Sequence, residues 1–243
     1  GARRRENPAR CGVGVAGAGA SGFFEGVQGG PTAGRKGVGE ERWRDHGGKG
    51  ANQADAAKRA GDNGALIGAI GSDELGSAAV AALASEAIDT RWLRTIEGES
   101  TGVALIMVDG TGENLIAVAS GANARLSPAL VDDAINDLRP ALVLTNLEVP
   151  DDCVLRAAEV AARVGARFVL NPAPFRPLPA ELLALVDILT PNEHEAADLL
   201  GHGGGSLSSL YEALSKHGVK HLVVTLGERG ASLRDALCAG PDP

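Results

Sequence analysis

From Gly47 onward, short apolar runs alternate with longer amphipathic stretches. Runs rich in Val, Ile and Leu predict buried strands, and stretches with apolar residues every three to four positions predict helices. The expected strands are 65–70, 141–145, 167–170, 186–190 and 221–225. The expected helices are 51–60, 74–87, 127–138, 151–164, 179–185, 193–200 and 206–217. This alternation predicts an α/β fold with a mostly parallel central sheet and helices on both faces.

A second pattern predicts a small β element outside that sheet. Two β-rich runs, 102–108 and 114–119, are joined by Asp109-Gly110-Thr111-Gly112. Asp-Gly between apolar runs is a strong hairpin signal. We therefore expect a β-hairpin within a unit of about residues 98–121.

The first 46 residues have a different texture, because Gly and Arg dominate and no clean periodicity appears. We expect an irregular segment here. The run 12–22 contains two overlapping G-x-G-x-x-G patterns, which in a dinucleotide-binding enzyme follow a strand and open a helix. No strand is evident before Gly12, so a dinucleotide-binding oxidoreductase is a minor alternative.

The composition disfavours some classes of function. A chain of 243 residues can form one α/β domain with a sizeable core. Its net charge of −8 disfavours nucleic-acid binding, which usually needs a basic face. Three widely spaced cysteines (Cys11, Cys153 and Cys238) predict free thiols in a reducing cytoplasm. No apolar run is long enough to suggest a membrane span.

The most distinctive motif is Gly47-Gly48-Lys49-Gly50-Ala51-Asn52, directly before an alanine-rich helical stretch. Glycines allow close backbone approach, and a helix start offers unpaired N–H groups to a polar or anionic ligand. Lys49 adds a positive charge, and the Asn52 amide adds a donor and an acceptor. The motif suits a polyhydroxylated or phosphorylated small molecule.

Polar or glycine-rich groups also follow four of the expected strands, where ligands of parallel sheets bind. Each has an ordinary structural explanation as a turn former or first-turn helix residue, but all are expected at one edge. Asn192 and Glu195 lie three apart on one helix face, where a carboxylate can hold Mg²⁺ through water. The full set is Asn146 and Glu148, then Asn171, then Asn192 and Glu195, and finally Thr225, Gly227 and Gly230.

Together these residues resemble the ribokinase, or PfkB, family of carbohydrate kinases over about residues 47–233. The matches come in family order. They are the glycine motif at 47–52 with Gly61 and Gly71, the lid hairpin 100–123, Leu147-Glu148, Asn-Pro-Ala-Pro at 171–174, Asn192 with Glu195, and Val-Thr-Leu-Gly-Glu-Arg-Gly at 224–230.

The resemblance implies a ribokinase-like fold and ATP-dependent phosphorylation of a sugar hydroxymethyl group, with D-ribose giving ribose 5-phosphate. It implies a lid that closes over the sugar and also joins two copies in a homodimer. The implied partners are a sugar and ATP, with no nucleic acid or membrane. The implied site residues are Gly47, Gly48, Lys49, Asn52 and Glu148 for the sugar, Asn192, Thr225, Gly227 and Gly230 for ATP, and Glu195 for Mg²⁺.

Two family features have no match in this sequence. Residues 1–46 offer no strand carrying the family's sugar-binding Asn-x-Asp pair, and no Gly-Ala-Gly-Asp run with the general-base Asp precedes Pro243. The family's monovalent-cation site is likewise unmatched. We therefore assign no catalytic residue, expect a C-terminally truncated domain over 47–243, and expect impaired activity.

The abrupt changes of texture at His46 and near Leu233 suggest that both ends are out-of-frame or truncated coding sequence. Two further alternatives stay open: a non-catalytic sugar- or nucleotide-binding remnant, and a kinase for another sugar or a nucleoside.

Overall fold

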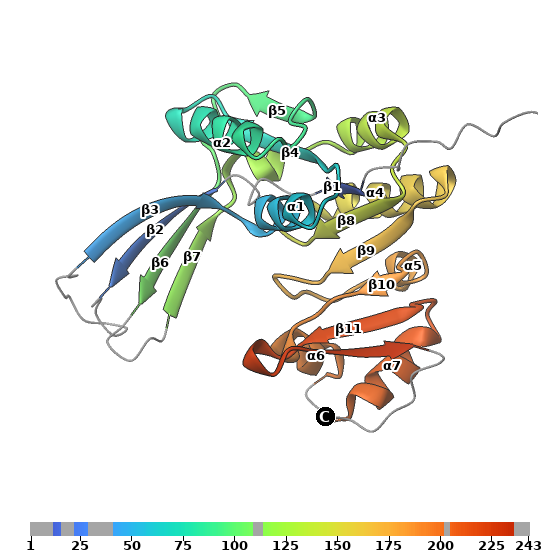
Figure 1. The fold of residues 1–243 in the computed structure, drawn as a ribbon. Helices are drawn as coiled ribbons and strands as arrows, with labels where there is room; N and C mark the ends of the chain where they lie inside the picture. The colour runs from blue at the N-terminus through green and yellow to red at the C-terminus, as the bar shows by residue number, and fades with distance from the viewer. Residues whose placement is uncertain (1–11, 16–21, 29–40, 109–113, 202–204, 236–243) are drawn as a thin grey trace, which may run out of the picture.

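The computed structural model describes residues 12–15, 22–28, 41–108, 114–201 and 205–235. Its main sheet has the strand order β12-β11-β10-β9-β8-β1-β4-β5. Neighbouring strands are parallel, except that β12 runs antiparallel to β11 (Figure 1). The strands are β1 (Gly12–Val15), β4 (Ala65–Gly71), β5 (Leu93–Ile96), β8 (Leu142–Asn146), β9 (Arg167–Asn171), β10 (Ile188–Leu189), β11 (His221–Thr225) and β12 (Ala231–Asp235).

Helices cover both faces of this sheet, as the alternating pattern predicted. Strand β4 is buried throughout, and its alternate side chains enter two different cores. Leu66 and Ile70 pack with α1 (Lys49–Arg59) and α2 (Glu74–Ser85). Ile67 belongs to the larger core under the remaining helices. These are α3 (Pro128–Leu138), α4 (Asp151–Val164), α5 (Ala180–Leu183), α6 (Glu193–Leu199) and α7 (Leu207–Ser215).

Local chemistry explains where these helices begin and end. The Asp73 carboxylate accepts a hydrogen bond from the Gly76 N–H at the start of α2, and Ser127 caps α3 ahead of Pro128. Gly165 ends α4 with φ 76°, a conformation that favours glycine. The predicted helix 179–185 is shortened to α5, and residues 202–204 of the predicted glycine interruption lie outside the described residues.

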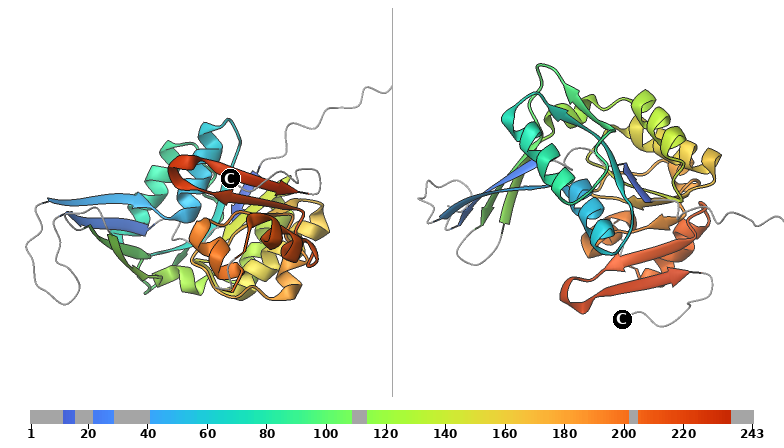
Figure 2. Two further views of the ribbon diagram at one scale, coloured as in Figure 1. Left: turned by 90° about the horizontal axis from the view of Figure 1, so that it is seen from below. Right: turned by 45° about the horizontal axis from the view of Figure 1, so that its top comes forward.

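A smaller, four-stranded sheet projects from the main body (Figures 1 and 2). Its order is β3 (Glu41–Gly47), β2 (Gly22–Gln28), β6 (Val103–Val108) and β7 (Asn114–Ala119). The predicted hairpin is confirmed as the antiparallel pair β6–β7. Its turn, 109–113, lies outside the described residues. We call this sheet the lid.

The expectation of an irregular segment before Gly47 is wrong for its described part. Strand β1 lies between β8 and β4, β2 pairs in parallel with β6, and β3 pairs with β2. β2 and β3 contain glycines and charges without period-two alternation, and β1 is only four residues long (Gly-Val-Gly-Val), so pairing with neighbours overrides their weak local propensity. The next described element after β1 is a strand rather than a helix, which removes the support for the dinucleotide fingerprint.

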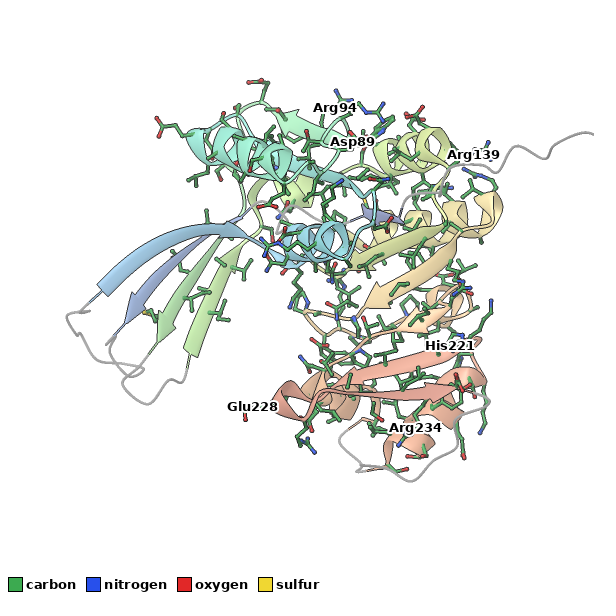
Figure 3. The ribbon with its side chains drawn as sticks, viewed as in Figure 1. Asp89, Arg94, Arg139, His221, Glu228 and Arg234 are labelled. Atoms are coloured by element: carbon green, nitrogen blue, oxygen red, sulfur yellow. The ribbon has the colours of Figure 1, made fainter. Side chains whose placement is uncertain are left out.

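Two further strands were not predicted. β5 extends the sheet beside β4. β12 pairs with β11 and includes Leu233, near which the sequence suggested a change to out-of-frame or truncated sequence. His221 on β11 and Arg234 on β12 are labelled in Figure 3. His221 Nδ1 lies 3.6 Å from Asp235 Oδ2, and Asp235 is a half-buried residue of β12.

Within the described residues, no helix combines the length and apolar character needed to cross a bilayer.

Candidate active site

The order of the main sheet creates a crevice beside β1. From β1 the chain passes through the lid and α1 to β4 on one side, and later returns to β8 on the other side. Open α/β sheets bind ligands outside the carboxyl ends of the strands at such a switch of direction. Helix α1 contacts β1, β4 and β8, so its N-terminus marks this position.

A cavity of about 800 Å³ lies here between the main body and the lid. Gly48, Lys49, Asn52 and Glu148 line it, and all four were predicted on the sugar side. Gly47, the fifth predicted residue, is buried at the end of β3 and is not among the lining residues. The lid closes one side of the cavity with apolar side chains, among them Val103, Ala104, Ile116 and Val118.

The glycine motif forms the tight entry into α1. Gly48 is the N-cap residue with φ 120°, a backbone conformation that side-chain-bearing residues rarely adopt. Its carbonyl accepts a hydrogen bond from the Asn52 N–H at 3.0 Å. The next N–H, that of Lys49, points across the cavity wall to Glu148 Oε2 at 3.4 Å. The motif therefore faces the loop after β8.

Glu148 is the acidic side chain of this cavity among the described lining residues. Burial raises its pKa, while the Lys49 charge and main-chain N–H partly oppose that shift. Its own N–H donates to Asn146 Oδ1 at 2.9 Å, and Asn146 is fully buried at the end of β8. A half-buried carboxylate beside an ammonium-bearing residue and an amide is well suited to accept hydrogen bonds from sugar hydroxyls.

Two polar lining residues, Asn123 and Arg176, were missed in the sequence. Asn123 is 2% exposed, and a Cβ added to Gly102 would lie 2.7 Å from its Nδ2 atom. Arg176 donates to the carbonyls of Leu147 and Val149. Asn123 lies in the short 3-10 helix η2 (Gly121–Arg125) and Arg176 in a loop, and periodicity gives no signal in either. For Arg176, the preceding Asn-Pro-Ala-Pro is the nearest hint.

The base of the lid is fixed to α2. Asp73 Oδ1 accepts from the Thr101 hydroxyl at 2.5 Å, and Oδ2 accepts from the Thr101 N–H at 2.8 Å. Thr101 Oγ1 in turn accepts from the Gly71 N–H at 3.0 Å. Burial raises the pKa of Asp73, but hydrogen bonds from Thr101 and Gly76 outweigh it and lower the pKa overall.

The predicted nucleotide-side residues lie farther along the same edge. Asn192 and Thr225 form a parallel bridge, and the Thr225 N–H donates to the Pro191 carbonyl at 3.0 Å. Gly227 and Gly230 have φ 59° and 85° around the turn η3 (Gly227–Arg229), and a Cβ on either would meet nothing within 4 Å. This turn is exposed and open to a ligand. Glu228 projects from it at the outer edge of the molecule (Figure 3).

Contacts along the carboxyl ends of the strands connect the cavity residues with the predicted nucleotide-side residues, although none of the nucleotide-side residues lines the cavity. Asn146 and Asn171 are register partners on β8 and β9. Asn171 Nδ2 then donates to the Thr190 carbonyl at 2.7 Å, beside Pro191 and Asn192. The lidded cavity and the glycine turn therefore share one sheet edge.

Asn192 and Glu195 form a reciprocal capping box at the start of α6. Asn192 Oδ1 accepts from the Glu195 N–H, and Glu195 Oε2 accepts from the Asn192 N–H, both at 2.8 Å. Glu195 is 8% exposed, and no group of three or more acidic, His or Cys side chains that could hold a metal occurs among the described residues. These donors fit a hydrated Mg²⁺ held through water and phosphate, and they do not fit a protein-ligated ion.

A doubly wound sheet with a lidded cavity and a glycine turn on one edge defines the class of α/β proteins that bind small molecules at the carboxyl ends of their strands. Residues 24–238 match the model of the pfkB family carbohydrate kinases, and the chain belongs to that family.

Its relatives include the ribokinase of Haemophilus influenzae, 43% identical over 189 residues that cover 76% of this chain and 62% of that protein. A deoxyribokinase of Salmonella typhi is 34% identical over 190 residues, again 76% of this chain and 62% of the relative. The structure of Arabidopsis thaliana ribokinase complexed with ribose and ATP superposes with a TM-score of 0.81 at 26% identity, covering 97% of this chain and 78% of that one. The chain thus spans somewhat less than two thirds of these curated relatives.

Proposed function

We propose that this chain is the sugar-binding part of an ATP-dependent carbohydrate kinase, and that its sugar is D-ribose. The observation that carries the proposal is the convergence of Lys49, Asn52 and Glu148 on one lidded cavity in a chain of the pfkB family. Ribose is favoured because the relatives named ribokinase include the one 43% identical to this chain.

The cavity supplies the chemistry that a pentose requires. Glu148 offers an anionic acceptor, Asn52 offers both a donor and an acceptor, and Lys49 offers a cation. The apolar lid residues Ile116 and Val118 would exclude water from the bound sugar, which strengthens these polar contacts. A site of this kind fixes the orientation of the hydroxymethyl group toward the edge that carries the glycine turn.

ATP supplies the transferable phosphoryl group, and Mg²⁺ neutralises its phosphate charge. Asn192, Thr225, Gly227 and Gly230 would hold the nucleotide, because their turn is open and its glycines leave space for close approach. Glu195 would orient a hydrated Mg²⁺ through water. Its carboxylate is held in place by the capping box.

Phosphoryl transfer also needs a group that accepts the proton of the sugar hydroxyl. Among the described residues that line the cavity, Glu148 is the one carboxylate, and it lies with the sugar-binding residues. We therefore expect this chain to bind ribose and to turn it over slowly, since no second carboxylate lines the described cavity and a general base typically contributes about 10²–10⁴ in rate.

Calorimetric titration with ribose, 2-deoxyribose, fructose and inosine, each with and without ATP, tests the proposal. We expect ribose to bind most tightly, with ribose-dependent ADP release far below an ordinary kinase rate. No binding of any sugar contradicts the function. ADP release at an ordinary rate contradicts the expected slow turnover, and preference for deoxyribose or inosine reassigns the substrate.

A non-catalytic sugar- or nucleotide-binding protein of the same fold is the second candidate. The capping box favours it, because Asn192 and Glu195 already have mutual structural partners. Binding of ribose and ATP with no detectable ADP release over hours identifies this case.

We further propose that two copies associate through the lid. Leu105 is 48% exposed and lies on the lid face opposite to that of Ala104 and Val118, which line the cavity. An exposed apolar side chain on the outer face of a thin sheet favours burial against a second sheet. Leu105→Asp should shift a dimer toward monomer in sedimentation, and a wild-type monomer would contradict the proposal.

A further inference from the structure

The loop that carries Glu148 is held from both sides by one side chain. Arg176 Nη1 donates to the Leu147 carbonyl at 2.5 Å, and Nη2 donates to the Val149 carbonyl at 3.0 Å. These are the carbonyls of the two residues that flank Glu148. Arg176 itself comes from the segment after β9 and also lines the cavity.

We propose that Arg176 is a positioning residue for sugar binding. Its guanidinium fixes the backbone around Glu148 and thereby holds the Glu148 carboxylate against the N-terminus of α1. The inference rests on the proposed function only in naming a sugar as the ligand. The fixing of the loop is a property of the chain itself.

The chemistry of arginine explains why this residue suits the task. The guanidinium is planar, always charged and presents its N–H donors in a rigid fork. Two carbonyls tied to one rigid group leave little freedom to the residue between them. A lysine ammonium is a single point on a flexible stem, so it can keep the charge but not the two-point geometry.

Further hydrogen bonds hold the same loop at its N–H groups and at the Glu148 carboxylate. The Glu148 N–H donates to Asn146 Oδ1 at 2.9 Å, and the Leu147 N–H donates to the Ala173 carbonyl at 2.9 Å. The Lys49 N–H then meets the Glu148 carboxylate at 3.4 Å. Arg176 supplies the contacts to the carbonyl side of the same loop, so its loss would free that side.

Arg176 also makes an ion pair that suggests a simpler structural role. Its Nε donates to Asp151 Oδ1 at 2.6 Å, at the first turn of α4. The Asp151 side chain is 81% exposed, and exposed pairs contribute little to stability. Asp151→Asn removes this pair and leaves both carbonyl contacts in place, which separates the two roles.

The test compares Arg176→Lys, Arg176→Gln and Asp151→Asn with a matched control, Arg91→Gln. Arg91 is likewise paired with an aspartate, Asp89, which bridges to Ala65 at the opposite end of β4 from the cavity and is labelled in Figure 3. We would measure ribose and ATP affinities by calorimetry, unfolding by urea, and hydrogen exchange of the amides of residues 147–149.

We expect both Arg176 variants to weaken ribose binding by roughly 10-fold or more, the effect of losing one charged hydrogen bond. ATP affinity should stay within about twofold, and amide exchange at 147–149 should quicken by roughly 10-fold. Asp151→Asn and Arg91→Gln should leave ribose affinity and exchange within about twofold.

Three results would overturn the inference. They are wild-type behaviour of Arg176→Lys, an equal loss in Asp151→Asn, and an equal loss of ATP affinity. If the wild-type chain binds no sugar, the proposed function fails, and hydrogen exchange still decides whether Arg176 fixes the loop.

Discussion

The main-chain N–H of Lys49 donates to the Glu148 carboxylate at 3.4 Å, although 99 positions separate the two residues in the chain. This contact joins the start of α1 to the loop after β8. It also sets the electrostatics of the cavity, because Lys49 stabilises a charge that burial disfavours. The charge on Glu148 therefore disfavours folding, whereas ligand binding uses the same charge as a hydrogen-bond acceptor.

We predict that Glu148→Gln stabilises the chain and weakens its ribose affinity by roughly 10–100-fold, because a neutral amide cannot replace a charged acceptor. Since the folded pKa of Glu148 is raised, its ionisation opposes folding as pH rises above the unfolded value. The stabilisation should thus be present at pH 7 and vanish below pH ~4. Urea unfolding at both values, with exposed Glu159→Gln as the control, checks this. A destabilised variant at pH 7 contradicts it.

We predict that Asp73→Ala lowers the free energy of unfolding by about 2–3 kcal/mol, because it removes a helix cap and leaves Thr101 without its acceptor. The folded pKa of Asp73 is lowered, so this contribution is present above the unfolded pKa and is lost as pH falls. The difference between wild type and variant should shrink between about pH 5 and pH 2.

Thr101→Ser provides the matched control, since it keeps the hydroxyl that reaches Asp73. It should cost less than about 1 kcal/mol. Equal losses in the two variants would show that packing of the Thr101 methyl group, and not the hydrogen bonds, holds the base of the lid.

We predict that Gly71→Ala is strongly destabilising, by about 3 kcal/mol or more, because the new Cβ would lie 2.4 Å from the Thr101 backbone nitrogen. Gly61→Ala is the comparison, since its Cβ would meet nothing and only the positive φ of 95° is strained. That variant should lose about 1–2 kcal/mol. Thermal unfolding of both decides the matter, and equal midpoints would refute the steric argument.

Mg²⁺ is expected to increase the affinity for ATP. We predict that this increase is roughly threefold to 10-fold smaller in Glu195→Gln than in the wild-type chain, because the carboxylate orients the hydrated ion. Glu193→Gln is the matched control in the same helical turn, where Glu193 is half exposed and paired with Arg229. Titrations with ATP alone and with Mg²⁺-ATP separate an effect on the metal ion from an effect on ATP binding itself. A loss in both titrations alike would assign Glu195 to the capping box only.

We predict that Cys153 resists alkylation in the folded chain. Burial, followed by the nearby Asp152, raises the pKa of its thiol to about 12, and the thiol donates to the Leu126 carbonyl at 3.3 Å. The reactive thiolate is therefore scarce at neutral pH. Iodoacetamide labelling with peptide mapping should modify Cys153 only after denaturation. Rapid modification under native conditions would contradict this.

Much of the fold was readable from the sequence because helices and buried strands leave periodic patterns. α4 was predicted to its exact ends by its apolar stripe and Gly165, and the hairpin β6–β7 was predicted by Asp-Gly between apolar runs. Strand β1 was missed because it is a four-residue Gly-Val alternation inside a glycine-rich run, and β2 and β3 were missed because their residues carry no such pattern. They become strands through the neighbours with which they pair.

The residues of the candidate site were likewise only partly predictable from the sequence. The motif at 47–52 and the polar strand ends could be located by sequence, because glycine spacing and strand order fix where they lie. Their binding roles and the cytoplasmic location stay predictions. Asn123 and Arg176 could not be found, since each acts through contacts with residues distant in the chain.

By itself the sequence determined the α/β class and the positions of most helices, and it located the polar and glycine-rich groups that follow the strands. These follow from local propensity, periodicity and spacing. The tertiary structure alone decided that β1 lies at the switch between β4 and β8, that the lid has four strands, and that Lys49 meets Glu148. Strand order and long-range hydrogen bonds depend on the packing of the whole chain, and short stretches of sequence do not encode them.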